Sequence, residues 1–191
     1  RRWDNRIVSF HDFSGTPSNL ETIYERLSAT GADIVKIAVQ ADRISDAIPL
    51  WKLLERARTE HKQLVPIAMG EAGKWTRILG LAHGSPLAYA SLDAAGGTAP
   101  GQITAADLIN VYRAKELTPE SKVFGLIAGD TSYSMSPYIQ NAAIGRAGID
   151  AVFVPLQVAD IGEFFRRIVR GRAREIDLNF RGFAVTNPHK Q

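Results

Sequence analysis

The alternation of short apolar runs with amphipathic helical windows is the feature that most constrains how this sequence can fold. In the window 18–29, for example, Leu20, Ile23, Tyr24 and Leu27 recur at the spacing of one helix face. Apolar runs joined by helices are typical of parallel strands in a sheet that is open or closed into a barrel. The expected strands are 7–10, 34–39, 64–69 and 87–92, and the expected helices are 18–29, 47–58 and one after 104, with a short loop or turn over 75–81.

Two polar pairs, each three residues apart, mark the starts of helices in this first part. Ser18 with Glu21 has the spacing of a capping box, and Thr104 with Asp107 precedes the last helical window. The sequence therefore predicts side-chain caps at both helix starts.

The polar, proline-containing segment LTPESK at 117–122 separates two patterns that do not repeat one another. Such segments are typical of domain boundaries. We expect a first domain over 1–117, a linker over 118–122 and a second domain over 123–191. The second domain is expected to hold strands at 123–128, 151–158 and about 182–185, a helix over 136–147 with Pro137 in its first turn, and a helix capped by Asp160 and Glu163.

Composition narrows the classes of protein. The formal charge of +3 is too small to favour a nucleic-acid or membrane partner, and the arginine-rich stretch 166–174 is interpreted as a solvated helix face with its exit loop. Cysteine is absent, which excludes disulfides and thiolate metal sites. No apolar run approaches a membrane span and no signal-peptide pattern is present, so a soluble, cytoplasmic protein is expected. We interpret both ends as cuts in a longer protein.

Lys36 interrupts the apolar run 34–39, near the end of an expected strand. In a barrel, catalytic side chains collect at this end of the strands, where His11 is also expected. Burial of an ammonium lowers its pKa and makes the neutral amine available as a Schiff-base nucleophile. Taken alone, such a lysine is more often a strand-edge residue that reaches water, and a lone histidine is more often a satisfied core or loop residue.

Four segments occur in the order and spacing of one known family. They are SFHDFSGTP at 9–17, ADIVKIAV at 32–39, PIAMGEAGKWTR at 66–77 and TAPGQI at 98–103. Together they resemble the type I 3-dehydroquinate dehydratases. The resemblance spans about 7–117 and implies the C-terminal half of a (β/α)8 barrel, roughly its fifth to eighth βα units.

The resemblance also implies residue roles. His11 would shuttle protons and stabilise the Schiff-base chemistry, Lys36 would form an imine with the substrate ketone, and Arg77 would bind the substrate carboxylate. Thr98 and Gln102 would supply a hydroxyl and an amide to the ligand. Thr98 departs from the more usual serine, and the acidic partner of the family histidine would precede the first residue of this chain.

Two further segments, AGDTSYSMSPYIQNAA at 128–143 and AVTNPHK at 184–190, resemble the substrate-binding domain of shikimate dehydrogenases. This resemblance implies that Ser134 and Ser136 hold the shikimate carboxylate, that Thr186 contacts the substrate and that Lys190 is the catalytic acid/base. Two hydroxyls just before a helix N-terminus make a suitable carboxylate site, although Ser136 could equally be a helix cap. Ala184 replaces the usual asparagine.

The two resemblances together imply an α/β protein with two consecutive activities. The parent enzyme would dehydrate 3-dehydroquinate to 3-dehydroshikimate and reduce that ketone to shikimate with NADPH, with no cofactor for the first step. The sequence contains no Gly-x-Gly-x-x-Gly motif, so NADP would bind beyond Gln191 and the isolated chain is expected to be inactive. The alternatives are a non-catalytic regulator that binds the same intermediates, and a Schiff-base aldolase, which would leave the second domain unexplained.

Overall fold

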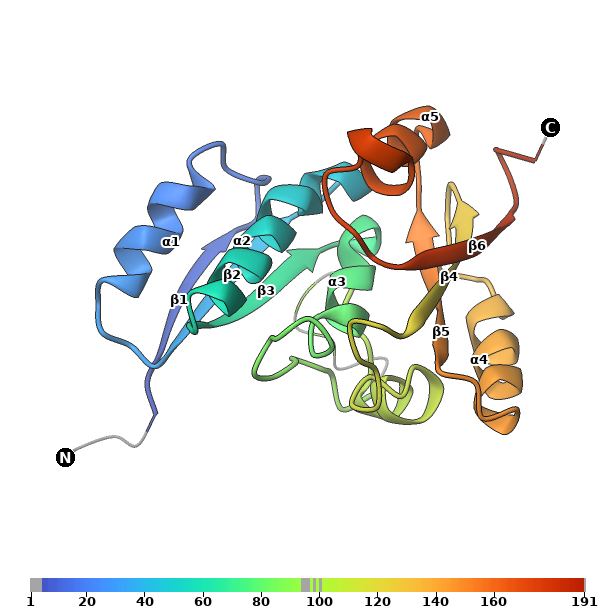
Figure 1. The fold of residues 1–191 in the computed structure, drawn as a ribbon, viewed down its shortest axis with the longest axis horizontal. Coiled ribbons are helices and arrows are strands. Elements are labelled where there is room, and N and C mark those ends of the chain that lie inside the picture. Colours follow the sequence, from blue (N-terminus) through green and yellow to red (C-terminus); the bar gives the residue numbers. More distant parts are fainter. Residues whose placement is uncertain (1–4, 94–96, 98, 100, 191) are drawn as a thin grey trace.

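The computed structural model describes residues 5–93, 97, 99 and 101–190. They form two three-stranded parallel sheets with helices packed around them (Figure 1). The first sheet has the order β1-β2-β3 and the second the order β5-β4-β6. The strands are β1 (Ile7–Asp12), β2 (Ile34–Gln40), β3 (Gln63–Met69), β4 (Lys122–Ala128), β5 (Ala151–Gln157) and β6 (Phe180–Val185).

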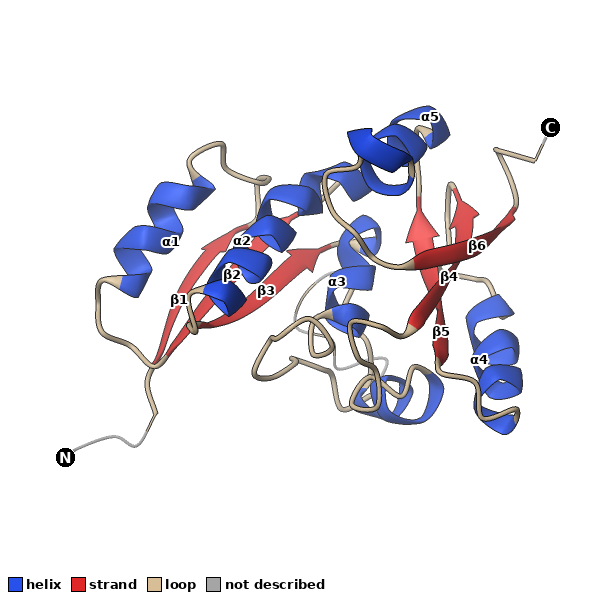
Figure 2. Cartoon of the chain, viewed as in Figure 1, coloured by secondary structure: helices blue, strands red, loops and turns tan. Residues whose placement is uncertain are grey.

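The helices connect these strands in the manner of βα units (Figure 2). The α-helices are α1 (Leu20–Ser28), α2 (Ile48–Thr59), α3 (Lys74–Leu79), α4 (Ser136–Arg146) and α5 (Ile161–Phe164). Short 3-10 helices are η1 (Ile44–Ala47), η2 (Glu71–Gly73) and η5 (Gly171–Ala173), and π-helical turns are η3 (Asp107–Val111) and η4 (Phe165–Val169). Within the described part of the chain, no helix is long and apolar enough to cross a membrane.

The register of the first sheet decides which side chains share a face. Ser9 pairs with Lys36, which pairs with Val65, so these three side chains lie on one face of β1, β2 and β3. The alternate residues Val35 and Ile37 are buried in the main core on the opposite face, where α1 and α2 pack. The strands therefore have one helix-covered face and one face that carries Lys36.

Most of the expected elements are confirmed, since their strands and long helices differ by only a few residues from the expected ranges. Asp160 caps α5 as predicted, because its side chain accepts a hydrogen bond from the amide of Glu163. Thr104 likewise accepts from the amide of Asp107 at 3.0 Å, although the turn that follows is π-helical. The arginine-rich stretch lies on η4, η5 and their exit, largely at the surface.

Three local predictions are wrong. The segment 75–81 holds the helix α3, whose Trp75 and Ile78 are fully buried, because a buried helix has no polar face for the sequence to reveal. The segment 87–92 forms no strand and pairs only through a bridge from Ser91 to Thr104. The N-cap of α1 is Asn19 rather than Ser18, and no side-chain hydrogen bond caps that helix.

The two sheets pack on either side of α3, as Figure 1 shows. One continuous apolar cluster includes buried residues from both parts of the chain. At its centre the ring of Trp51 lies 4.8 Å from that of Trp75 and 4.8 Å from that of His83, measured between ring centroids. The two parts therefore share a core rather than touching only at their surfaces.

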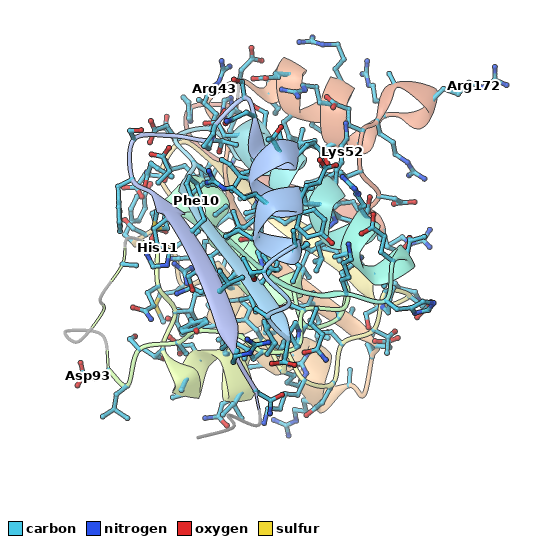
Figure 3. The ribbon with its side chains drawn as sticks, turned by 90° about the vertical axis from the view of Figure 1, so that its left-hand side faces the viewer. Phe10, His11, Arg43, Lys52, Asp93 and Arg172 are labelled. Atoms are coloured by element: carbon cyan, nitrogen blue, oxygen red, sulfur yellow. The ribbon has the colours of Figure 1, made fainter. Side chains whose placement is uncertain are left out.

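A chain of alternating charges runs along the edge of this shared core. Arg43 lies 2.6 Å from Glu163, and Arg167 contacts Glu163 at 3.1 Å and Glu175 at 2.5 Å. Lys52 completes the chain at 2.6 Å from Glu175. In Figure 3 Arg43 and Lys52 lie at the end of the molecule where α5 is found. Networks of this kind contribute orientation more than stability when they are partly exposed.

We predict that the titration of His83 makes the fold less stable in acid. Burial, with a smaller effect of the Arg58 charge, lowers the pKa of His83 to about 4. Because the unfolded chain binds this proton first, stability should fall on the order of 3 kcal/mol as the pH drops from about 6.5 to about 4. His83→Phe keeps a ring beside Trp51 and removes the titration, so denaturant unfolding at several pH values should show a flatter dependence for this variant.

The control is His61→Asn, which removes an exposed histidine at a backbone φ of 54° that asparagine tolerates. It should keep the pH dependence of the wild type. Equal slopes in the wild type and in His83→Phe would show that His83 is not the group responsible.

Candidate active sites

Lys36 is the third residue of β2, and its side chain is half-buried on the face of the sheet opposite α1 and α2. The strand residues on either side of it along this face, Ile34 and Ala38, join Val65 and Ile67 in a small apolar cluster. Burial, and then the charge of Arg77, lowers the pKa of Lys36. Both effects increase the fraction of neutral amine, which is the nucleophilic form.

Arg77 approaches this face from α3. Its side chain is only 5% exposed, and burial lowers its pKa to about 10. Together with Val65, Ile67 and Tyr89 it lines a narrow pocket beside β3. A guanidinium in such a position can bind a carboxylate through two parallel hydrogen bonds.

His11 lies on β1 two residues beyond Ser9, and therefore on the same face as Lys36 and closer to the carboxyl end of the strands. Burial, and then the charge of Lys36, lowers the pKa of His11. Its imidazole is therefore neutral near pH 7 and able to accept a proton. Figure 3 shows His11 on β1, next to Phe10 in the strand.

Gln102 lies in the loop that meets the end of β3. Its backbone N–H donates a hydrogen bond to the carbonyl of Ala99 at 3.2 Å. Its neighbour Gly101 has a φ of +67°, and a Cβ there would collide with the backbone of Gly70. This close approach explains the glycine of the TAPGQI segment. Thr98 lies outside the described residues.

The structure thus brings His11, Lys36 and Arg77 to one face of the first sheet. The arrangement can bind an anionic ketone, form an imine on Lys36 and move a proton through His11. Among the described residues no group of His, Asp or Glu side chains could hold a metal ion.

The second site gathers at the carboxyl ends of β4 and β6. Ser136 is the first residue of α4, with Pro137 behind it, and its amide donates to the hydroxyl oxygen of Ser134 at 3.2 Å. The N-cap itself is Met135, so capping is not the role of Ser136. Both serine side chains are half-buried, and the positive end of the helix dipole favours an anion beside them.

Thr186 follows β6 directly, and its amide donates to the carbonyl of Ile127 at 3.0 Å. The loop that leads to the exposed Lys190 is held by its own neighbours. The amide of Gly129 donates to the carbonyl of Asn187 at 3.0 Å, and Nε2 of His189 donates to the carbonyl of Val158 at 2.7 Å. Since β4 lies between β5 and β6, these bonds tie all three strand ends together.

The sequence reasoning missed Asn141, which positions α4. Its side chain is fully buried, donates to the carbonyls of Pro137 at 2.8 Å and Phe153 at 2.7 Å, and accepts from the amide of Phe153 at 2.9 Å. The spacing of Asn141 from Pro137, one helical turn, was the only available signal. Through Asn141 the helix that carries Ser136 is fastened to β5.

The fold and these two sites define an α/β protein with a candidate Schiff-base lysine on one sheet and a candidate carboxylate site on the other. The chain belongs to the type I 3-dehydroquinase family, whose model matches residues 4–119, and residues 126–191 match the shikimate dehydrogenase substrate binding domain.

One bifunctional relative spans both matched regions, and relatives named only as dehydratases cover about half of the chain. The bifunctional 3-dehydroquinate dehydratase/shikimate dehydrogenase of Arabidopsis thaliana, described as chloroplastic, is 34% identical over 187 residues, which are 97% of this chain and 29% of that protein. The 3-dehydroquinate dehydratase of Methanosarcina mazei is 40% identical over 99 residues, 51% of this chain and 41% of the relative. The solved 3-dehydroquinate dehydratase of Geobacillus kaustophilus matches 56% of this chain and 42% of its own, with a TM-score of 0.50 and 34% identity. The chain therefore spans less than half of each relative.

We predict that Asn141→Leu destabilises the chain by about 3 kcal/mol, because the buried amide and carbonyl of Phe153 lose their partners while the apolar volume is kept. Gln140→Leu, at the exposed neighbouring position of the same helix, should change stability by less than about 0.5 kcal/mol. Denaturant unfolding measures both. A small effect at Asn141 would mean that these hydrogen bonds are not what fastens α4.

Proposed function

We propose that this chain is part of a bifunctional shikimate-pathway enzyme that converts 3-dehydroquinate to 3-dehydroshikimate and then to shikimate. In this proposal residues 1–117 are the second half of a (β/α)8 barrel, 118–122 are the linker and 123–191 are the substrate-binding unit of the dehydrogenase. The observation that carries it is Lys36, half-buried on the same sheet face as His11 and close enough to Arg77 for that charge to lower its pKa.

The dehydration uses these three residues. Arg77 binds the substrate carboxylate, and the neutral amine of Lys36 attacks the ketone carbon, whose oxygen leaves as water to give an imine. The imine withdraws electrons from the neighbouring carbon, so that a base can remove its proton. His11 takes that proton and returns it to the departing hydroxyl, which leaves as water. Hydrolysis of the imine then releases 3-dehydroshikimate and restores Lys36. Gln102 and Thr98 are proposed to contact the ligand from their loop.

In the second unit, Ser134 and Ser136 are proposed to hold the carboxylate of the substrate at the start of α4. Thr186 and Lys190 act from the end of β6, where Lys190 exchanges a proton with the reacting oxygen. The relatives imply an NADP-dependent dehydrogenase, but the sequence has no glycine-rich dinucleotide motif. In this proposal NADP is bound by residues outside this chain.

Small-molecule acids are the proposed substrates, and a cytoplasmic location stays a prediction. A regulator that binds the same intermediates is disfavoured because it would need neither a buried lysine nor a histidine beside it. A Schiff-base aldolase would leave the match of residues 126–191 without a role.

Treatment of the full-length protein with 3-dehydroquinate and borohydride should leave a stable covalent adduct on Lys36, because hydride reduces the imine to a secondary amine. Peptide mass measurement locates the adduct. The adduct should disappear in Lys36→Ala and persist in Lys62→Ala, which removes an exposed lysine in the turn between α2 and β3. An adduct that survives Lys36→Ala would place the imine elsewhere.

The two activities should be separable in the full-length protein. Lys190→Ala should lower ketone reduction by orders of magnitude and leave dehydration within about twofold, as expected for sites in different units. Lys122→Ala, an exposed lysine at the start of β4, is the control and should change neither rate. A parallel loss of both activities in a folded Lys190→Ala protein would contradict the two-site proposal.

A further inference from the structure

Tyr89 faces the candidate nucleophile and has no role in the mechanism above. The Nζ atom of Lys36 lies 4.1 Å from the centroid of the Tyr89 ring, well inside the range of a cation–π interaction. The tyrosine comes from the segment that was expected to be a strand and is instead a loop. It also lines the pocket that contains Arg77.

The loop that carries Tyr89 is anchored on both sides. Before it, the hydroxyl of Ser85 donates to the carbonyl of Leu87 at 2.8 Å, and Leu87 packs on the apolar cluster around Ala38 and Val65. After it, the amide of Ser91 donates to the carbonyl of Ile103 at 3.0 Å. The fold therefore fixes the backbone on both sides of Tyr89.

The charges around Lys36 make this ring its favourable electrostatic partner. The charge of Arg77, on α3, lowers the pKa of Lys36, and the charge of Lys36 in turn lowers the pKa of His11, on β1. Within the described residues Lys36 forms no ion pair with a carboxylate. The negative face of an aromatic ring attracts an ammonium without neutralising it by proton transfer.

We propose that Tyr89 is a positioning residue that holds the ammonium form of Lys36 at the site and releases it when the proton leaves. The attraction of the ring acts on the charged form, so it orders the long lysine side chain while the site is empty. Once the amine is neutral, the attraction weakens and the nitrogen is free to attack a carbonyl. This inference rests on the proposed role of Lys36 as the nucleophile.

The test compares Tyr89→Leu with Tyr89→Phe in the full-length protein. Leucine keeps apolar bulk beside Lys36 and removes the ring, whereas phenylalanine keeps the ring face and removes only the hydroxyl. The lysines are reductively methylated with 13C, and the Lys36 resonance is identified by its absence in Lys36→Arg. Its titration by NMR then reports the charge of Lys36 without requiring any activity.

We expect Tyr89→Leu to lower the pKa of Lys36 by about half a unit, because the ring no longer stabilises the ammonium, and Tyr89→Phe to leave it unchanged. The pH profile of borohydride trapping should move to lower pH by the same amount in Tyr89→Leu only. An unchanged or raised pKa in Tyr89→Leu, or equal shifts in both variants, would overturn the inference.

The two proposals can fail separately. If the wild type yields no adduct on Lys36, the imine mechanism fails whatever the titration shows. If the adduct forms on Lys36 but the Lys36 pKa and the pH profile of trapping are the same in the wild type and in Tyr89→Leu, only the proposed role of Tyr89 fails.

Discussion

The structure of the first unit depends on placing two cations, Lys36 and Arg77, near each other at a partly buried face. Burial lowers the pKa of both side chains, and the charge of Arg77 lowers the pKa of Lys36 further. A site of this kind is stabilised by an anion that binds between the cations, and it offers that anion a neutral amine. In the proposed function, substrate binding and nucleophile activation would therefore have one electrostatic cause.

The rest of the fold compensates for the free-energy cost of partly burying Lys36 and Arg77. The parallel register puts Lys36 on one face of β2 while its neighbours Val35 and Ile37 anchor the strand in the core. Arg77 is carried by a short helix that is buried between the two sheets, with Trp75 packed on Trp51. The apolar burial that the two parts of the chain share offsets the cost of desolvating the cations.

The second unit differs from the first, because its candidate residues lie in loops and at the start of α4 rather than on strands. Hydrogen bonds between strand ends replace the rigidity that a strand would give. The amide of Gly129 donates to Asn187 and the ring of His189 to Val158, so hydrogen bonds join the loops after β4, β5 and β6 into one piece. Asn141 adds the start of α4 to the same piece by fixing the helix to β5.

The sequence by itself determined the parallel α/β class and most element boundaries, because periodicity is a property of neighbouring residues. Its short motifs also pointed to His11, Lys36, Ser134 and Lys190 as candidate site residues. The sequence could not reveal α3, because a short helix that is buried on all sides has no amphipathic pattern. It also predicted a strand where Tyr89 lies in a loop, because a short apolar run can occur in a loop as well as in a strand. Only the tertiary structure decided that Tyr89 lies against Lys36, that Asn141 joins α4 to β5, and that the two units share a core. Each of these depends on contacts between residues distant in the chain, and such contacts have no signature in local spacing.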